Sequence, residues 1–172
     1  MKKVILLVAV VLTATFANAQ DMKYGVRGGI DMVSAKTTVT VSDGFGNTYS
    51  SSATASTTGF YAGGFVDFSI ADKFTVEPGI AYHAASKDGV KLNFLSVPVT
   101  FKYLVAEKIN ILAGPALFYN MDSEAQDKTT FNLDLGASYD ITEDFFVDPR
   151  YSLGLTGDTK VSHFLIGVGY RF

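Results

Sequence analysis

Apolar and polar side chains alternate along most of this chain, and no other feature constrains its fold as strongly. In the closing segment, HFLIGVGYRF, every second residue from Phe164 to Phe172 is bulky and apolar, whereas the residues between them include two glycines and Arg171. A period of two predicts a β-strand, because successive side chains point to opposite faces of a sheet. The pattern recurs and predicts eight strands, over residues 22–33, 58–70, 74–85, 92–105, 109–121, 129–141, 145–156 and 162–172.

The second face of these strands combines small residues with charges. The charged residues are Arg27, Asp31, Asp67, Glu77, Lys102, Asp134, Asp140, Asp148, Arg150 and Arg171. A soluble lipocalin-like barrel or sandwich would have to enclose all of them in its core at a high desolvation cost. A membrane barrel turns its apolar face to lipid and its polar face inward, where the charges pair. We therefore predict an all-β fold, an eight-stranded antiparallel up-and-down transmembrane β-barrel, with these ten residues as a charge network in the lumen.

Hairpin register predicts which of these charges meet. The expected diagonal cross-strand pairs are Glu77 with Lys102, Arg150 with Asp134, and Arg171 with Asp148. Bulky residues such as Phe65, Phe118 and Phe146 also face inward. An eight-stranded barrel is only wide enough for its own side chains, so we expect a filled lumen and no open pore.

The connections and the aromatic residues give the barrel two different ends. Short turns (ADK, AEK and TED) follow the second, fourth and sixth strands, and longer or more polar connections follow the others, as in outer-membrane barrels. Outward aromatic residues form two expected belts. The belt at the turn end is Tyr24, Phe68, Phe74, Tyr103, Tyr139, Phe145, Tyr170 and Phe172, and the other is Phe60, Tyr82, Tyr119, Phe131 and Phe164. An even strand number returns both termini to the turn end, which we predict to be periplasmic.

The first twenty residues, MKKVILLVAVVLTATFANAQ, have the form of a secretory signal peptide. We expect cleavage after Ala19, which divides the chain into a signal peptide (residues 1–19) and one barrel domain (residues 20–172). The chain has no cysteine, so a disulfide framework is excluded. Its net charge of −3 and the lack of a basic stripe argue against nucleic acid as a partner.

Several segments resemble a known family. The stretch GFYAGGFVDFSIADKFTVEPGIAYHAASKDG, followed by LNFLSVPVTFKYLV, resembles the PorT-like family of small outer-membrane β-barrels, and YGVRGGIDM is similar to that family's first strand. The last strand looks like the carboxy-terminal assembly signal of outer-membrane proteins, with Gly167, Tyr170 and Phe172 at the expected positions. The resemblance implies a fold and a location in the cell outer membrane, with membrane lipid and the barrel-assembly machinery as partners. It implies little about activity.

The two histidines raise the question of catalysis or metal binding. His163 adjoins Ser162, and His83 lies three residues before Ser86, so each serine points to the opposite face from its histidine. The two histidines could approach each other across a narrow lumen, but the pattern places no third metal ligand beside them. We therefore predict no catalytic residue, no metal site and no cofactor.

The predicted function is structural or surface display by a monomeric barrel without enzymatic activity. Half of the residues in the loop 34–57 are Ser or Thr, and its turn signal SDGFGN suits a hairpin that extends the first two strands. The alternatives are binding or adhesion to an extracellular ligand through this loop, an accessory role in secretion or transport, and, third, a lipid-modifying outer-membrane enzyme.

Overall fold

The computed structural model describes residues 22–42, 45, 48–87, 90–121, 128–157 and 159–172. The predicted signal peptide lies outside these residues. Among the described residues, we find no helix with the length and apolar character needed to cross a membrane.

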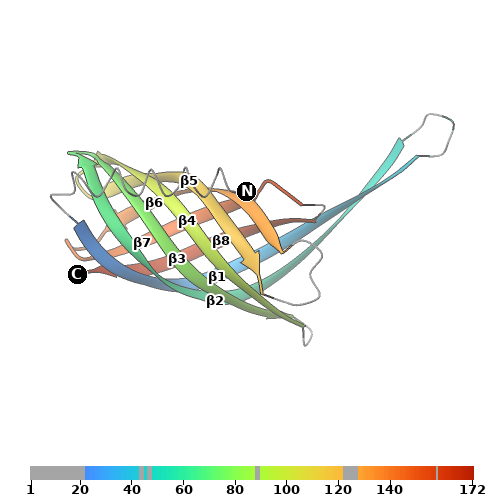
Figure 1. Ribbon diagram of the computed structural model, residues 1–172, viewed down its shortest axis with the longest axis horizontal. Helices are drawn as coiled ribbons and strands as arrows, with labels where there is room; N and C mark the ends of the chain where they lie inside the picture. Colours follow the sequence, from blue (N-terminus) through green and yellow to red (C-terminus); the bar gives the residue numbers. More distant parts are fainter. Residues whose placement is uncertain (1–21, 43–44, 46–47, 88–89, 122–127, 158) are drawn as a thin grey trace.

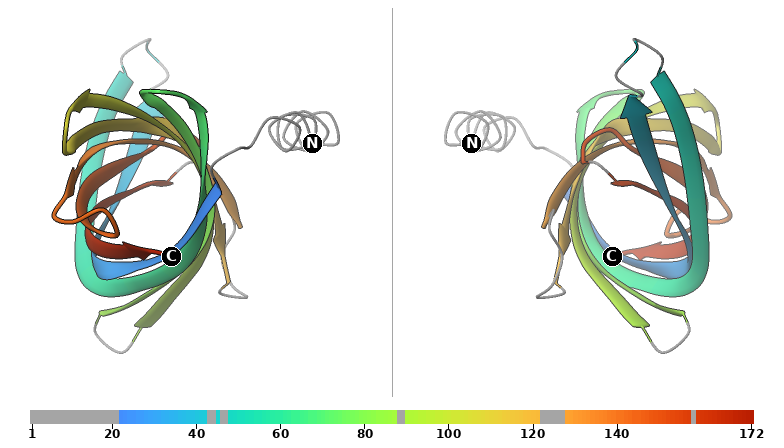
Figure 2. Two further views of the ribbon diagram at one scale, coloured as in Figure 1. Left: turned by 90° about the vertical axis from the view of Figure 1, so that its left-hand side faces the viewer. Right: turned by 90° about the vertical axis from the view of Figure 1, so that its right-hand side faces the viewer.

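The chain forms a closed barrel of eight strands (Figures 1 and 2). The strands are β1 (Met22–Ser42), β2 (Thr48–Ala71), β3 (Phe74–Lys87), β4 (Val90–Ala106), β5 (Ile109–Asn120), β6 (Thr129–Asp140), β7 (Phe145–Gly154) and β8 (Thr159–Arg171). Each strand pairs antiparallel with the next, and β8 returns to pair with β1 from Gly25↔Arg171 to Thr37↔Thr159. The predicted up-and-down barrel is confirmed.

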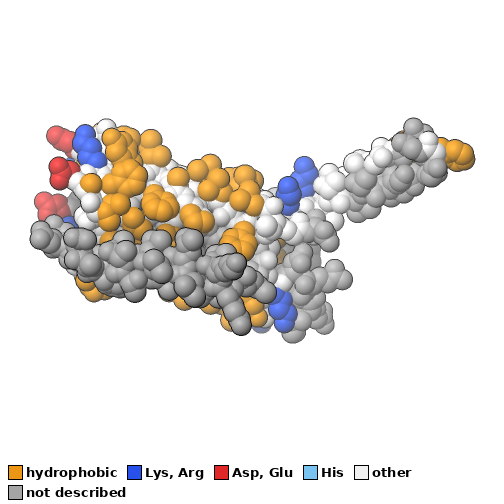
Figure 3. Space-filling model, turned by 45° about the horizontal axis from the view of Figure 1, so that its top comes forward, with side chains coloured by type: hydrophobic (Ala, Val, Ile, Leu, Met, Phe, Trp, Pro, Cys, Tyr) orange, Lys and Arg blue, Asp and Glu red, His pale blue; other side chains and the backbone are white. Residues whose placement is uncertain are grey.

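The alternation in the sequence separates an outer face from a lumen. Along β8, for example, the side chains of His163, Leu165 and Arg171 are buried, whereas those of Phe164 and Ile166 are exposed. Large apolar side chains cover the wall of the barrel, and the acidic side chains visible in this view gather at one end (Figure 3). A continuous apolar surface of this kind is stable against lipid but not against water.

Both predicted aromatic belts lie on the outer face, with one exception. At the turn end, Phe74 pairs with Tyr103 and Phe145 pairs with Tyr170 in the strand register, and these side chains are exposed. The five aromatic residues expected at the loop end are all exposed as well. The prediction is wrong for Phe68, whose side chain is only 3% exposed.

The two ends of the barrel differ as expected in most respects. The beginning of β1 and the end of β8 lie at the end that carries the three short turns (Figure 1). The connection after β3 is shorter than predicted. Both β3 and β4 are longer than expected, so only residues 88–89 separate them. The sequence signal for these strands stops where the strand tips become polar, so it underestimated their length.

The first two strands continue as a hairpin well beyond the rest of the barrel (Figure 1). Pairing of β1 with β8 ends at Thr37, and pairing of β2 with β3 reaches only Gly59, yet β1 and β2 stay paired to Ser42↔Thr48. Cross-strand hydroxyl pairs such as Thr38 with Ser52, at 3.1 Å, join the two strands there. The hairpin considered for loop 34–57 is therefore present.

Closure of the ring depends on a close approach of two backbones at the seam between β1 and β8. A Cβ atom added to Gly29 would lie 2.1 Å from the carbonyl oxygen of Ile166, whereas one added to Gly64 would meet only the carbonyl oxygen of Gly25, at 3.7 Å. We predict that Gly29→Ala destabilises the barrel by about 1–3 kcal/mol through overpacking, and that Gly64→Ala does so by much less. Urea titration of the refolded barrel in detergent measures both values. Equal stability of the two variants would show that the seam does not need the glycine.

Candidate functional site

Charged side chains fill the half of the lumen nearest the short turns. Lys102 Nζ lies 2.7 Å from Asp67 Oδ1. Arg171 bridges two carboxylates, with Nε 3.0 Å from Asp67 Oδ2 and Nη1 2.8 Å from Asp140 Oδ1. This first layer joins β2, β4, β6 and β8, so it ties together strands that are not neighbours in the sheet.

Glu77 is the centre of the next layer of ion pairs. Its carboxylate, 1% exposed, contacts Arg27, Lys102 and Arg150. Asp148 pairs with the two arginines as well, with its Oδ2 atom 2.9 Å from Arg27 Nη1 and 2.7 Å from Arg150 Nη2. Cations and carboxylates alternate through this layer, so each buried charge has an opposite charge beside it, which offsets its desolvation.

Aromatic rings of the lumen cover the guanidinium groups. The guanidinium carbon of Arg27 lies 4.2 Å from the ring centroid of Phe65, and that of Arg171 lies 4.3 Å from the ring centroid of Phe146. Such cation–π contacts are favourable where the cation is desolvated. The rings also occupy the space that water would need in order to pass.

The structure corrects two of the three predicted charge pairs. Glu77 contacts Lys102 as expected. Arg150 pairs with Asp148 and Glu77 instead of Asp134, and Arg171 pairs with Asp67 and Asp140 instead of Asp148. Both predictions considered only neighbouring strands, whereas an arginine side chain is long enough to reach across a lumen this narrow.

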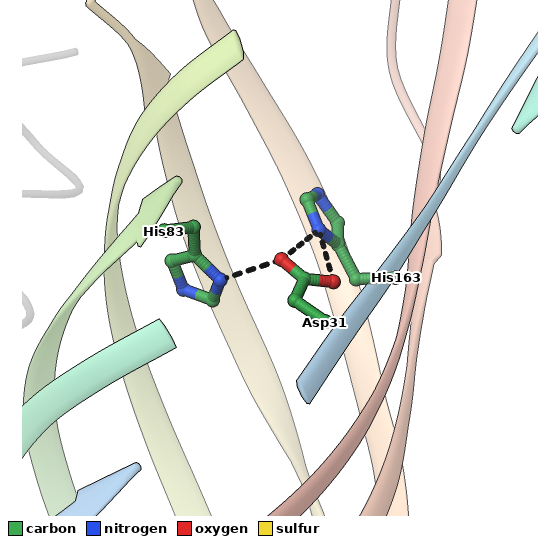
Figure 4. A group of neighbouring side chains, drawn as sticks. All are labelled: Asp31, His83 and His163. Atoms are coloured by element: carbon green, nitrogen blue, oxygen red, sulfur yellow. Dashed lines mark hydrogen bonds and ion pairs between the residues drawn. The ribbon is translucent and has the colours of Figure 1, made fainter. Parts of the chain in front are cut away.

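Two further carboxylates lie toward the loop end and belong to a different group. Asp31 of β1 faces His83 of β3 and His163 of β8 (Figure 4). The Oδ2 atom of Asp31 lies 2.8 Å from His83 Nδ1 and 3.0 Å from His163 Nδ1. Asp134 is buried nearby, and its Oδ1 atom has no hydrogen-bond partner among the described residues. The two histidines do meet, and Asp31 is the third polar group that the sequence pattern did not place beside them.

A serine extends this group into a hydrogen-bonded chain. Ser96 Oγ lies 2.9 Å from His83 Nε2, so Ser96, His83 and Asp31 follow one another in the order of a catalytic triad. All three side chains are buried, and the adjoining cavity measures about 30 Å³, room for only one or two water molecules. No substrate carbonyl fits beside Ser96, so the chain of hydrogen bonds orders the histidine and gives it no access to a substrate.

Sequence reasoning missed Ser96 because it considered only serines near each histidine in the chain. Ser96 lies on β4, opposite Ala81 in the register, and is therefore a diagonal cross-strand neighbour of His83. The same diagonal rule that was applied to the charges identifies this contact. The hydroxyl of Ser162 accepts from the Gly154 N–H and the carbonyl of Ser86 accepts from Thr57, so neither serine takes part in the histidine group.

An apolar cluster closes the lumen at the loop end. Its buried members are Val33, Ala85, Phe94, Ala116 and Phe118. The Phe118 ring stacks on His163 with a centroid separation of 4.3 Å, so the cluster packs directly on the histidine group. From the turn end, the lumen thus contains ion pairs, then the histidine group, then an apolar plug.

The expected assembly-signal residues lie in the last strand as follows. Tyr170 and Phe172 are exposed on the outer face with ring centroids 5.3 Å apart, and the Phe172 N–H donates to the Tyr24 carbonyl oxygen at 2.8 Å. Gly167 faces the lumen, where an added Cβ atom would lie 2.0 Å from the Tyr61 hydroxyl.

The exposed position of Phe172 generates a prediction about assembly. Deletion of Phe172 removes one backbone hydrogen bond and an exposed ring, so we expect little change in folding yield in detergent. We expect a clear loss of inserted protein in cells if the residue is part of the assembly signal. Membrane fractionation and refolding yield are the two measurements, and equal losses in both would show that Phe172 only packs.

The position of Glu77 generates a prediction about stability. Glu77→Ala leaves three cations without their shared partner, and breaking a buried ion pair in this way costs about 3–5 kcal/mol. The matched control is Glu143→Ala in an exposed turn, for which we expect a change within about 0.5 kcal/mol. Both values come from urea unfolding in detergent. A Glu77→Ala barrel as stable as the control would show that the pairs contribute nothing.

Comparisons with known proteins agree with this geometry. The structure is similar to Ail, the attachment invasion locus protein of Yersinia pestis, with a TM-score of 0.58 and 18% identity over 89% of this chain and 100% of that chain. It is also similar to Neisserial surface protein A, with a TM-score of 0.55 and 16% identity over 87% of this chain and 97% of that one. Identities this low support the fold alone. No curated protein matches the sequence.

The family comparison covers almost the whole chain. The family model described as the outer membrane protein beta-barrel domain matches residues 4–172. The match agrees with the apolar outer wall, the closed ring of strands and the polar lumen, and it gives the location as the outer membrane. The chain belongs to the outer membrane protein beta-barrel domain family.

Proposed function

We propose that this protein is a sealed outer-membrane barrel that displays the β1–β2 hairpin at the cell surface as a contact element. Both termini lie in the periplasm in this proposal, and the barrel is neither an open pore nor an enzyme. The observation that carries it is the length of the hairpin. The outer part of the hairpin consists of residues 38–42 and 48–52, which pair with each other. It lies beyond the residues of β1 that pair with β8 and beyond those of β2 that pair with β3.

The chemistry of the hairpin suits contact with other molecules. Its strands present Ser and Thr hydroxyls, and two aromatic side chains stand out from them, Phe45 at 91% exposed and Tyr49 at 64% exposed. Exposed aromatic rings among hydroxyl groups can bind both protein and saccharide surfaces. Ail, an attachment invasion locus protein, shares the fold, which supports an attachment role for a barrel of this size without identifying a ligand.

The lumen supports the sealed-barrel part of the proposal. Between the ion-pair layers and the apolar plug lies a cavity of about 30 Å³ beside Tyr61 and Glu77, whereas the hollow of about 340 Å³ beside Lys102 and Arg171 lies at the turn end. Polar groups that pair with one another across the lumen stabilise the ring and do not form a path for solutes. The buried position of Ser96 argues against the lipid-modifying enzyme, and only the resemblance to PorT-like barrels supports a role in secretion.

Two epitope insertions test the display. An epitope placed after Phe45 should be labelled by antibody on intact cells, because the hairpin tip is the part of the chain farthest from the turns. The matched control, an epitope after Asp72 in the β2–β3 turn, should be labelled only after the outer membrane is permeabilised. The reverse result would invert the proposed orientation, and the absence of both labels from intact cells would remove surface display.

A hairpin replacement tests the contact role. Because Thr37 and Ala53 are partners in the register, an Asn-Gly turn can replace residues 38–52 without disturbing the ring. The variant should still run as a heat-modifiable barrel. Its cells should adhere less than wild-type cells to surfaces coated with heparin, chosen because a structure of Ail contains a heparin analogue. Equal adhesion by the two strains would contradict the contact role.

A conductance measurement tests the sealed lumen independently of the hairpin. Wild-type barrels reconstituted in planar bilayers should give no steady conductance. Phe118→Ala opens the apolar plug but leaves the ion pairs in place, so it serves as the comparison. Steady conductance by the wild type would sink the sealed-barrel proposal.

A further inference from the structure

We propose that Asp31, His83 and His163 bind one divalent transition-metal ion of the zinc class inside the lumen. The ligands are the carboxylate of Asp31 and the Nδ1 atoms of both histidines. The site goes beyond the proposed display function and does not depend on it. It would fasten β3 to the seam between β1 and β8, because each of these strands supplies one ligand.

The ligand atoms already converge on a single point. One ligand atom from each residue can be chosen so that all three lie within 4.8 Å of one another. The two Nδ1–Oδ2 separations are 2.8 and 3.0 Å. Zinc–ligand bonds of about 2.0–2.1 Å place ligand atoms roughly 3.3 Å apart in a tetrahedral site, so the two separations from Asp31 need to lengthen by only a few tenths of an ångström. The ion replaces the protons on the two Nδ1 atoms, and each neutral ring then carries its proton on Nε2.

The surroundings hold both rings in their present orientation. Ser96 Oγ lies 2.9 Å from His83 Nε2, the ring atom that stays free when Nδ1 binds a metal. Such a contact from the far side of the ring is typical of metal-bound histidines and strengthens binding. The Tyr61 ring stacks on His83 with a centroid separation of 5.5 Å, and Phe118 stacks on His163 at 4.3 Å. The ligands are thus positioned before any ion arrives.

The charge and the space around the group suit a divalent ion with a fourth ligand. Asp134 and His83 line the same cavity of about 30 Å³, which has room for a water molecule beside His83. Asp134 forms no ion pair with the described residues, so its carboxylate can balance the second charge of the ion. Two imidazoles select zinc-class ions over magnesium and calcium, which prefer oxygen ligands.

Metal content after refolding is the first test. The full chain without its signal peptide and without a histidine tag is refolded in detergent with Zn²⁺ or Co²⁺, and free metal is then removed by gel filtration. Refolding with the metal present avoids the need for an ion to enter a closed lumen. We expect one ion per barrel and, with Co²⁺, the intense visible absorption of a tetrahedral site.

Variants separate this site from adventitious binding. His83→Gln, His163→Gln and Asp31→Asn should each abolish the stoichiometric ion. Ser96→Ala should weaken binding by about 10–100-fold, because it removes the group that orients His83. Its matched control is Ser138→Ala, another buried lumen serine, whose hydroxyl oxygen accepts from Asn110 in the half of the lumen near the turns. This serine pair stays informative even if a ligand variant does not fold.

Nitrogen NMR of protein labelled with ¹⁵N-histidine reports which ring nitrogen binds the metal. A change in the stability of the barrel alone would not produce this signal. Only two histidines are present, so the spectrum contains two rings. Zinc should shift both Nδ1 resonances and leave both Nε2 atoms protonated. The proposal is overturned if the refolded wild type retains less than one-tenth of an equivalent of Zn²⁺, if the double histidine variant retains as much as the wild type, or if an Nε2 atom, and not Nδ1, takes the chemical shift of a metal-bound nitrogen. In each of these cases, the group is a hydrogen-bonded cluster only.

Discussion

A barrel whose outer wall faces lipid must pair its buried charges from within, and this constraint organises the half of the lumen near the turns. The carboxylates of Asp67, Glu77, Asp140 and Asp148 meet the cations of Arg27, Lys102, Arg150 and Arg171. A single unmatched charge in this low-dielectric interior would cost several kcal/mol, so the network is stable only as a whole. Backbone pairing closes the ring, and the ion pairs offset the cost of burying charged side chains inside it.

The layers of the lumen differ in the kind of interaction that fills them. Ion pairs fill the half near the turns, the group of Asp31, His83 and His163 lies beyond them, and the cluster around Phe118 closes the loop end. Because the apolar plug lies between the polar layers and the loop end of the barrel, it separates these layers from the hairpin. Contact with the outside and chemistry inside the barrel can therefore vary independently in this molecule.

The fold was predictable from the sequence because strand period, turn length and the position of aromatic residues all point to the same barrel. The exact strand ends were not, since the polar tips of β1 and β2 lose the apolar alternation while hydroxyl pairs such as Thr38 with Ser52 continue the ladder. The inward position of Asp31 was predicted from its parity. Its partners were not. His163 is a diagonal neighbour of Asp31 only across the seam that closes the ring, and His83 reaches Asp31 from β3, which does not pair with β1.

The seam between β1 and β8 has a consequence for the order of events during folding. Every other strand pair joins neighbours in the chain, and such hairpins close quickly. The seam instead joins residues such as Asp31 and His163, which are 132 positions apart, so its loop-closure entropy is by far the largest. The seam should therefore form last. The contact between Asp31 and His163 exists only in the completed ring, which makes the two histidines natural reporters of the final step of folding.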